Sequence, residues 1–320
     1  MQLTLLKCHG SSNDFILLDE CSGMNRSTPE GDRSAITKLL CDRQTGIGAD
    51  GILFYLASHV ADCQMRMFNP DGSEAEMCGN GLRCIGRYCA ERLGKDTVSV
   101  ETKKAILRVS KGAPIYEGIE TFEAEIGPVS LDPTSLPMAV DTPAFVNAYL
   151  PELSSILRWT ALSVPNPHII TLLDNIDPEQ VNQIGRTANG SSTFPNGVNV
   201  SFVRDLGENK IFVMTYERGV GITYSCGTAM SASAYVASLH GITAQGQPTQ
   251  VFNNGGMVIC HVPDNTGNIL LKGNATFVFE TTVTVSDDLD SIVLPSPWEI
   301  RTAEVSAYES LQKYAKSLIW

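Results

Sequence analysis

The sequence lacks three features that would each define a class of protein. No apolar run approaches the ~18 residues of a membrane-spanning helix, so no membrane partner is expected. The first residues, "MQLTLLKCHG", hold too short an apolar stretch for a signal peptide, which predicts a cytoplasmic location. Basic residues are few, 23 Lys and Arg against 35 Asp and Glu. The net charge of −12 argues against a nucleic-acid partner, because such partners require a basic surface.

Motifs for common cofactors and metals are also missing. The sequence has no P-loop, no G-x-S-x-G, no C-x2-C and no lysine motif for pyridoxal phosphate. "GIGADG" (46–51) matches G-x-G-x-x-G, but the apolar segment "ILFYL" follows it where a dinucleotide site needs a helix. We therefore expect neither a cofactor nor a metal.

Cysteines are present without a disulfide pattern. There are nine, an odd number in a chain of 320 residues, which argues for a reducing compartment. Two of them, Cys78 in "EMCGNGLRC" and Cys226 in "YSCGTAMSA", each open a Cys-Gly step. Free cysteine is among the most buried residue types, so we assign the others to packing. These are Cys8, Cys21, Cys41, Cys63, Cys84, Cys89 and Cys260.

The pattern of apolar residues predicts an α+β fold. Most apolar segments are four to seven residues long and rich in Val, Ile, Phe or Tyr, which indicates many strands. Helical patterns are fewer, at about 82–92, 229–239 and 303–318. The first two helices follow the two Cys-Gly steps directly.

Segments rich in Gly, Pro and polar residues divide the chain. "GPVSLDPTSLP" (127–137) is the best linker in the middle, and "SDDLDSIVLPSP" (286–297) marks a second boundary. We therefore expect an N-terminal half, 1–134, a C-terminal half, 135–285, and a helical tail, 286–320, that acts in packing or dimerisation.

The two halves show a weak internal repeat. Cys226 follows Cys78 by 148 positions, and the same offset superposes Phe54 on Phe202 and Phe68 on Tyr216. Each segment also runs in the same order, from an apolar strand through a polar turn to Cys-Gly and a small-residue helix. The simplest interpretation is two similar domains that each supply one cysteine to a shared cleft.

A cysteine directly before a helix has a defined chemistry. The unsatisfied N–H groups and the positive end of the helix dipole favour thiolate, and they can also hold a carboxylate. Two such cysteines could flank one carbon, one removing a proton as thiolate and the other returning one as thiol. The alternative, that each cysteine is merely buried, stays open for either one taken alone.

The longer motifs resemble one enzyme family. "NPDGSEAEMCGNG" (69–81) and "ERGVGITYSCGT" (217–228) are similar to diaminopimelate epimerase, as are "HGSSNDFILLD" (9–19), "PNPH" (165–168) and "FPNGVNVSFV" (194–203). The likeness extends to about residue 283. It implies two pseudo-symmetric domains, each a barrel-like sheet around a central helix. It also implies cofactor-independent interconversion of LL- and meso-diaminopimelate, in lysine biosynthesis and peptidoglycan precursor supply, by a homodimer.

The resemblance assigns roles to individual residues. Cys78 and Cys226 are implied to be the thiolate and thiol pair, and His168 and Glu217 to orient the substrate and assist proton transfer. The remaining positions are implied to bind the amino-acid substrate. They are Asn13, Asn69, Gly79, Asn80, Asn166, Asn199, Glu217, Arg218, Gly227 and Thr228. Asp14 and Asp71 we interpret as structural turn residues.

The chain departs from the family pattern in four places. Gly51 stands where many members carry glutamine, Ile222 where glutamate is usual, and Ala229 where glycine is common. The tail after about 286 has no counterpart in the usual pattern.

Three alternative functions stay open. One is a racemase of the same fold for histidine- or proline-type substrates, although Glu217 beside Arg218 favours diaminopimelate. A second is a non-catalytic relative, which the presence of both cysteines disfavours. The third is a thiol redox protein, which the lack of C-x-x-C disfavours.

Overall fold

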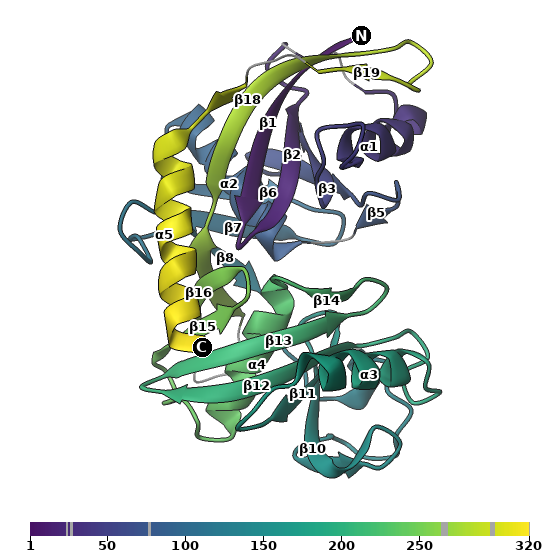
Figure 1. Ribbon diagram of the computed structural model, residues 1–320, viewed down its shortest axis with the longest axis vertical. Coiled ribbons are helices and arrows are strands. Elements are labelled where there is room, and N and C mark those ends of the chain that lie inside the picture. The colour runs from purple at the N-terminus through teal and green to yellow at the C-terminus, as the bar shows by residue number, and fades with distance from the viewer. Residues whose placement is uncertain (24, 26–27, 76–77, 264–267, 295–297, 320) are drawn as a thin grey trace. The chain divides into compact units, whose positions relative to one another are not determined.

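The computed structural model describes residues 1–23, 25, 28–75, 78–263, 268–294 and 298–319 (Figure 1). Glu76 and Met77, within the first Cys-Gly motif, lie outside the described residues. The chain forms two compact units, one of residues 1–124 with 273–310 and one of 125–272 with the C-terminal residues from 311. The boundaries expected from the sequence, 134/135 and 285/286, stay a prediction.

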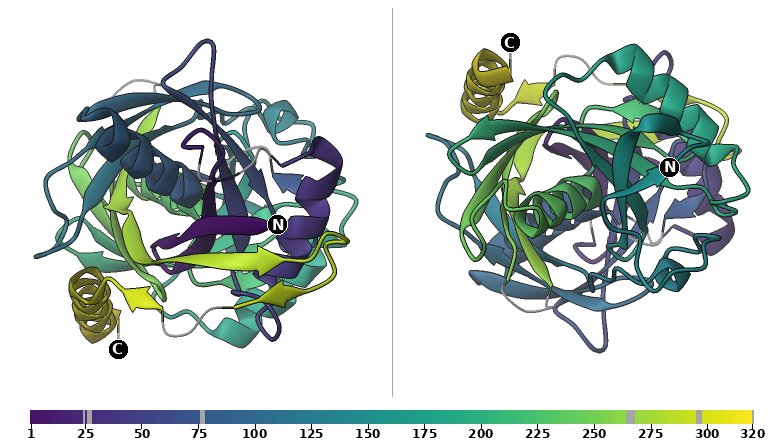
Figure 2. Two further views of the ribbon diagram at one scale, coloured as in Figure 1. Left: turned by 90° about the horizontal axis from the view of Figure 1, so that it is seen from above. Right: turned by 90° about the horizontal axis from the view of Figure 1, so that it is seen from below.

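The first unit is a sheet that encloses a helix. Its sheet is built from the following strands: β1 (Gln2–Gly10), β2 (Asn13–Asp19), β3 (Gly51–Leu56), β4 (Cys63–Phe68), β5 (Glu74–Ala75), β6 (Thr97–Glu101), β7 (Ile106–Lys111), the start of β8 (Thr121–Ile126), β18 (Thr276–Val285), β19 (Ile292–Val293) and β20 (Glu299–Ile300). Helix α2 (Gly79–Leu93) contacts β1, β2, β3, β4, β6 and β7, and Figure 2 shows it surrounded by strands. Helix α1 (Arg33–Cys41) packs on the outside.

Both faces of the central strands are buried, which explains their continuous apolar sequences. Ile52 and Phe54 of β3 pack with Ile36 of α1 on the outer face. Leu53 points the other way, toward Gly81 of α2, because successive strand residues face opposite sides of a sheet. The sheet is thus covered by one helix outside and one helix inside.

The second unit repeats this arrangement. Its strands are β9 (Ala148–Leu150), β10 (Ser154–Ser163), β11 (Pro167–Leu172), β12 (Asn199–Gly207), β13 (Lys210–Glu217), β14 (Gly221–Thr223), β15 (Pro248–Asn253), β16 (Gly256–His261) and most of β17 (Ile269–Asn274). Helix α4 (Gly227–Leu239) contacts β10, β11, β12, β13, β15 and β16, as α2 does in the first unit (Figure 2). Helix α3 (Pro178–Asn189) takes the place of α1.

The strand pairing is the same in both units. β1 to β4 pair antiparallel, parallel and antiparallel in succession, and β10 to β13 do the same. Even the register agrees: Ile52 pairs with Phe68, and Val200 pairs with Tyr216, each residue 148 positions after its counterpart. The predicted repeat and the predicted α+β fold are therefore confirmed.

Helix α5 (Thr302–Ile319) occupies the predicted helical tail and is drawn in yellow in Figure 1. Its first half, to Ser310, belongs to the first unit, and its remainder belongs to the second. One face carries the buried side chains, Tyr308, Leu311, Ala315 and Ile319. Every helix in the described part of the chain is too short or too polar to cross a bilayer.

Candidate active site

Cys78 caps the start of α2. Its backbone is extended, with φ −144° and ψ 111°, and its sulfur accepts a hydrogen bond from the N–H of Gly81 at 3.5 Å. The amide oxygen of Asn13 accepts from the Cys78 thiol at 3.7 Å and from the Asn80 amide at 3.2 Å. Three residues predicted from the sequence, Asn13, Cys78 and Asn80, thus meet in the first unit.

Asp50 holds Asn13 in place and was not predicted. Its carboxylate accepts from the Asn13 amide at 2.9 Å, and it shares the Arg43 guanidinium with Asp14. Burial alone would raise the pKa of Asp14, but Arg43 and Lys7 outweigh burial and lower it to about 2. The sequence signal for Asp50 was the motif "GIGADG", whose aspartate immediately precedes β3. Because β3 pairs parallel with β2, which starts at Asn13, Asp50 lies beside Asn13.

Arg83 is a second residue that sequence reasoning missed. Its side chain is fully buried, and its guanidinium donates to the Asn80 amide oxygen at 3.0 Å and to the Gly79 carbonyl at 3.4 Å. A charged residue four positions inside a small-residue helix was the signal, because arginine is rarely buried without partners. Arg83 fixes the orientation of the Asn80 side chain beside Cys78.

Asn69 and Asp71 lie in the turn that follows β4. The Asn69 amide donates to the Ser73 hydroxyl at 3.0 Å, and Asp71 accepts from the Ser73 N–H at 2.9 Å. Asp71 therefore shapes the turn as an Asx residue does, as the sequence predicted.

The second unit carries a chain of polar side chains that ends at Cys226. Cys226 is the N-cap of α4, with φ −122° and ψ 114°, and its sulfur lies 3.4 Å from the Thr228 hydroxyl. The Asn166 amide donates to that hydroxyl at 3.1 Å. His168 Nε2 lies 3.0 Å from the Asn166 amide oxygen. Four predicted residues are thus connected in series.

The hydrogen bonds of this series run in one direction. Because the Asn166 NH2 group donates to Thr228, its oxygen faces His168, so the imidazole proton is on Nε2. The Thr228 hydroxyl accepts from Asn166 and keeps its own proton for Cys226. The series therefore presents a donor to the Cys226 sulfur.

Other groups act on Cys226 in the opposite sense. Burial raises the pKa of its thiol well above the usual range, and the nearby Glu217 carboxylate raises it further. The Thr228 hydroxyl and the Ala229 N–H lower this pKa but do not offset the increase. Although a helix start by itself favours thiolate, Cys226 holds its proton in this unit.

His168 is fully buried and neutral. Burial lowers the pKa of its imidazole to about 3, with a smaller contribution from the Arg218 charge. Its Nδ1 has no hydrogen-bond partner among the described residues. At neutral pH this histidine can donate from Nε2 but cannot act as a cation.

Asn199, Glu217 and Arg218 cluster where β13 ends. The Asn199 amide oxygen accepts from the Arg218 N–H at 3.0 Å, and Glu217 accepts from the Thr223 hydroxyl. The Arg218 side chain is exposed, and its guanidinium donates to the Asn196 carbonyl at 3.1 Å. This cluster therefore offers a carboxylate, Glu217, and a guanidinium, Arg218, to a ligand that carries both charges.

The two half-sites are structurally equivalent. Phe15 pairs with Gly51 in the first unit, and His168 pairs with Asn199, the counterpart of Gly51, in the second. Two positions before Phe15 and His168 lie Asn13 and Asn166. Each of these asparagines contacts the second residue of its central helix, Asn80 in one unit and Thr228 in the other.

Around this shared arrangement the two units differ in chemistry. At four pairs of equivalent positions the second unit carries the more polar residue, and three of these residues, His168, Glu217 and Arg218, are titratable or charged. The pairs are Phe15 and His168, Gly51 and Asn199, Asn69 and Glu217, and Pro70 and Arg218. The first unit thus supplies a thiol beside the Asn13 amide, which Asp50 holds, and the second supplies a thiol beside the Glu217 carboxylate.

The structure gives a packing reason for one departure from the family pattern. A Cβ atom at Gly51 would lie 2.7 Å from the Phe68 carbonyl oxygen, so a glutamine side chain does not fit on this backbone. Ala229 is fully buried within α4, whereas Ile222 is exposed on β14.

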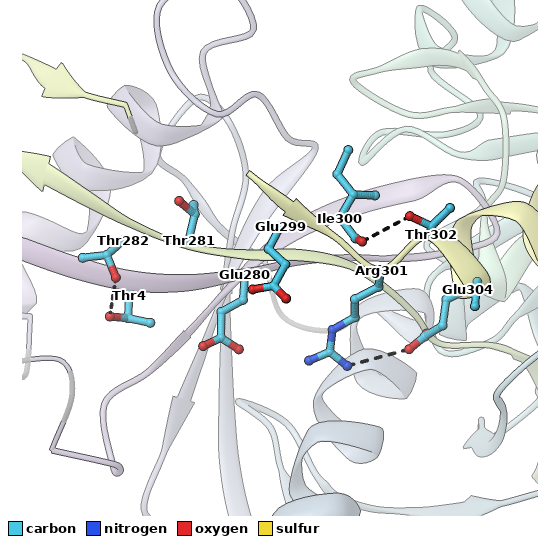
Figure 3. A pocket seen from close by; sticks show the side chains of 10 residues that line it. Thr4, Glu280, Thr281, Thr282, Glu299, Ile300, Arg301, Thr302 and Glu304 are labelled. Carbon is cyan, nitrogen blue, oxygen red and sulfur yellow. Dashed lines mark hydrogen bonds and ion pairs between the residues drawn. The ribbon is translucent and has the colours of Figure 1, made fainter. Parts of the chain in front are cut away.

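A cavity of about 740 Å³ lies elsewhere in the first unit. It is lined by residues of β18, β20 and the start of α5, and Figure 3 shows Glu280, Glu299 and Arg301 directed into the same space. None of the residues predicted for the site lines it.

Solved structures share this fold. A phenazine biosynthesis protein of the PhzF family from Bacillus anthracis superposes with a TM-score of 0.63 at 17% identity, covering 89% of this chain and 100% of its own. A hydroxyproline epimerase from Agrobacterium vitis superposes with a TM-score of 0.60 at 14% identity, covering 95% and 98%. The chain therefore has the same sheet-rich α+β fold as these two proteins.

Sequence relatives define the class of protein as an isomerase of the epimerase type. A diaminopimelate epimerase from Clostridium acetobutylicum is 45% identical over 288 residues, covering 88% of this chain and 86% of its own. One from Listeria welshimeri is 40% identical over 322 residues, covering 98% and 97%. Its coverage includes the C-terminal tail, so this segment has a counterpart in that relative.

The chain belongs to the diaminopimelate epimerase family, whose sequence pattern matches residues 5–112 and 160–278.

Proposed function

We propose that the protein interconverts LL- and meso-diaminopimelate by proton transfer at the α-carbon, with Cys78 and Cys226 as the two proton-transfer groups. The observation that carries the proposal is the equivalence of the two half-sites. Each unit presents one cysteine at a helix start, flanked by an asparagine and the second residue of the helix. One substrate contacted by both thiols gives inversion, since one removes a proton and the other returns one.

The raised pKa of Cys226 supports one assignment of the starting roles. Cys226 rests as the thiol, because burial and Glu217 raise its pKa. This makes Cys226 the proton donor of the resting enzyme in our proposal and leaves the role of base to Cys78. The Thr228 hydroxyl stabilises the negative charge that forms on Cys226 after it gives up its proton.

Backbone N–H groups at the two helix starts hold the α-carboxylate. Gly79 and Asn80 provide them in the first unit, and Gly227 and Thr228 in the second, because the first N–H groups of a helix have no acceptor within the helix itself. The positive ends of both helices also stabilise the charge that develops when the α-proton leaves.

The distal end of the substrate meets the charged cluster of the second unit. Arg218 is exposed and can form a forked pair with the distal carboxylate, and Glu217 can accept from an ammonium group. Asn69, Asn166 and Asn199 provide both donors and acceptors for the remaining polar atoms. The reaction would serve lysine biosynthesis and peptidoglycan precursor supply. The homodimer implied by the family resemblance stays a prediction that light scattering would test.

The test is α-deuterium exchange in D2O, followed by NMR, with no cofactor added. The substrates are LL- and meso-diaminopimelate, histidine and proline, and the variants are Cys78→Ala and Cys226→Ala. Cys21→Ala is the matched control, because Cys21 is exposed and lies outside the proposed site.

We expect exchange on diaminopimelate alone, loss of epimerisation in both site variants and full activity in the control. Exchange confined to histidine or proline would keep the chemistry and move the substrate to the alternative racemase. Full epimerisation by either site variant would refute the two-cysteine proposal.

A further inference from the structure

An ion pair connects helix α5 to α2, the helix whose N-cap is Cys78. Both carboxylate oxygens of Glu304 in α5 pair with the Arg87 guanidinium of α2, at 2.5 and 2.9 Å. Arg87 is buried and stacks over the Phe277 ring, with its guanidinium carbon 3.9 Å from the ring centroid. A bidentate pair of this kind fixes geometry as well as adding energy.

One helical turn after Glu304, Tyr308 contacts the turn between β1 and β2. Its side chain is buried, and its ring meets the His9 ring edge to face with centroids 4.3 Å apart. The Ser12 hydroxyl donates to the Tyr308 hydroxyl at 3.4 Å.

This turn has a backbone that needs outside support. Ser11 and Ser12 both have positive φ angles, 54° and 66°, which side chains with a Cβ rarely adopt. The Asn274 amide oxygen accepts from the Ser11 N–H at 2.7 Å, and Arg83 donates to the Ser11 hydroxyl at 3.3 Å. Tyr308 of α5 provides a further contact to this turn through Ser12.

The turn leads directly into Asn13. Asn13 is the first residue of β2, and its amide oxygen accepts from both Cys78 and Asn80. A displacement of Ser12 therefore moves the group that orients the Cys78 thiol.

We propose that Tyr308 is a positioning residue for the Cys78 half-site, acting through Ser12 and Asn13, and that Glu304 anchors its helix on α2. The C-terminal tail is thus part of the support of the active site. The catalytic role of Tyr308 rests on the proposed function. Its effect on the reactivity of the Cys78 thiol does not, because that reactivity can be measured without substrate.

The experiment compares Tyr308→Phe with Tyr314→Phe in the full-length protein. Both change one tyrosine of α5, but Tyr314 packs on Phe252 in the second unit. One measurement gives kcat and KM for epimerisation of LL-diaminopimelate. The other follows alkylation of Cys78 and Cys226 by iodoacetamide without substrate, peptide by peptide, so that Cys226 is an internal reference.

We expect Tyr308→Phe to lower kcat/KM about fivefold, mainly through kcat, as loss of one hydrogen bond in a positioning contact would. Alkylation of Cys78 should rise about twofold, since Asn13 no longer holds the thiol as firmly, while that of Cys226 stays unchanged. Ser12→Ala should give the same result, and the double variant should be no worse than either single change.

Equal behaviour of Tyr308→Phe and Tyr314→Phe in both measurements would overturn the inference. So would a parallel change at both cysteines, which indicates general loosening of the fold. An inactive wild type would refute the proposed function alone, because the alkylation of Cys78 would still decide the role of Tyr308.

Discussion

At the scale of single residues, Thr228 and Glu217 act on the Cys226 sulfur in opposite directions. The hydroxyl donates toward the sulfur and lowers the pKa of the thiol, whereas the carboxylate repels the thiolate and raises it. The sequence placed both residues in the site through family resemblance. It did not give their opposing effects, because those depend on contacts made across the fold.

Thr228→Val should raise the pKa of Cys226, because valine has the shape of threonine without the hydroxyl. Loss of one hydrogen bond to a charged group is worth about 1.5–3 kcal/mol, so epimerisation should fall by at least tenfold. Thr228→Ser, which keeps the hydroxyl, is the control. The pH dependence of iodoacetamide alkylation at Cys226 measures the shift, and an unchanged profile in Thr228→Val would contradict the assigned hydrogen bond.

Glu217→Gln should lower the pKa of Cys226, because the change removes a negative charge beside the sulfur. Alkylation of Cys226 at pH 8 should therefore become faster while epimerisation becomes slower. Such opposite changes would separate an electrostatic role from general damage to the site. Glu208→Gln, at an exposed position in the same unit, is the matched control. Slower alkylation in Glu217→Gln would show that the carboxylate does not act on this thiol.

At the scale of secondary structure elements, the central helices depend on close approach to the sheet. Gly86 lies in the middle of α2, and a Cβ atom there would be 2.3 Å from Val109 Cγ1 of β7. Helix propensity alone would favour alanine at this position. The periodicity of the sequence predicted the helix. It could not show which face of the helix packs so closely against the sheet that only glycine fits.

Gly86→Ala should therefore destabilise the protein. The gain in helix propensity, about 1 kcal/mol, is opposed by overpacking that costs about 1–3 kcal/mol. Urea denaturation followed by circular dichroism would show a lower midpoint. A Val109→Ala background removes the two methyl groups but leaves the Val109 Cβ, 2.6 Å from the added Cβ, so the same change should lower the midpoint less there. An equal lowering in both backgrounds would indicate that the Val109 methyl groups are not the cause.

The two helices after the Cys-Gly steps were predicted to begin at about 82 and 229, close to their observed starts at Gly79 and Gly227. Each Cys-Gly step followed by small residues marks a helix N-terminus by local backbone chemistry, and α2 and α4 begin at Gly79 and Gly227. The residues that support these helices were less predictable. Asp50 and Arg83 become partners of the site only when distant segments pair, which periodicity does not report.

At the scale of the whole molecule, histidines whose pKa is lowered in the fold link stability to pH. The pKa of His168 is about 3 in the fold, below the ordinary value near 6.5 that an unfolded chain restores. The unfolded state therefore binds a proton below pH 6.5 that the folded state does not bind until about pH 3. The stability contributed by this histidine is present above pH 6.5 and is lost as the pH falls through that window. The pKa of His9 is lowered to about 4, mainly by burial, and acts in the same sense.

The free energy of unfolding should decrease by about 1.4 kcal/mol per pH unit for each such histidine on acidification below pH 6.5. His168→Gln should be less stable at pH 7.5 but should lose less stability between pH 7.5 and pH 5. Urea midpoints at the two pH values measure the difference. His59→Gln, at an exposed position, is the control, and an equal loss in both variants would contradict the assigned pKa of His168.

The sequence alone determined the repeat, the strand-rich α+β fold and the positions of both cysteines at helix starts. The fold and the helix starts follow from local patterns and motif resemblance, and the repeat follows from an offset of 148 residues. The strand pairing in the structure keeps the same offset. Only the tertiary structure decided that Cys226 holds its proton, that Asp50 and Arg83 support the first half-site, and that Tyr308 meets Ser12. The reason is physical: burial and charge act through space, and Ser12 and Tyr308 are 296 positions apart in the chain.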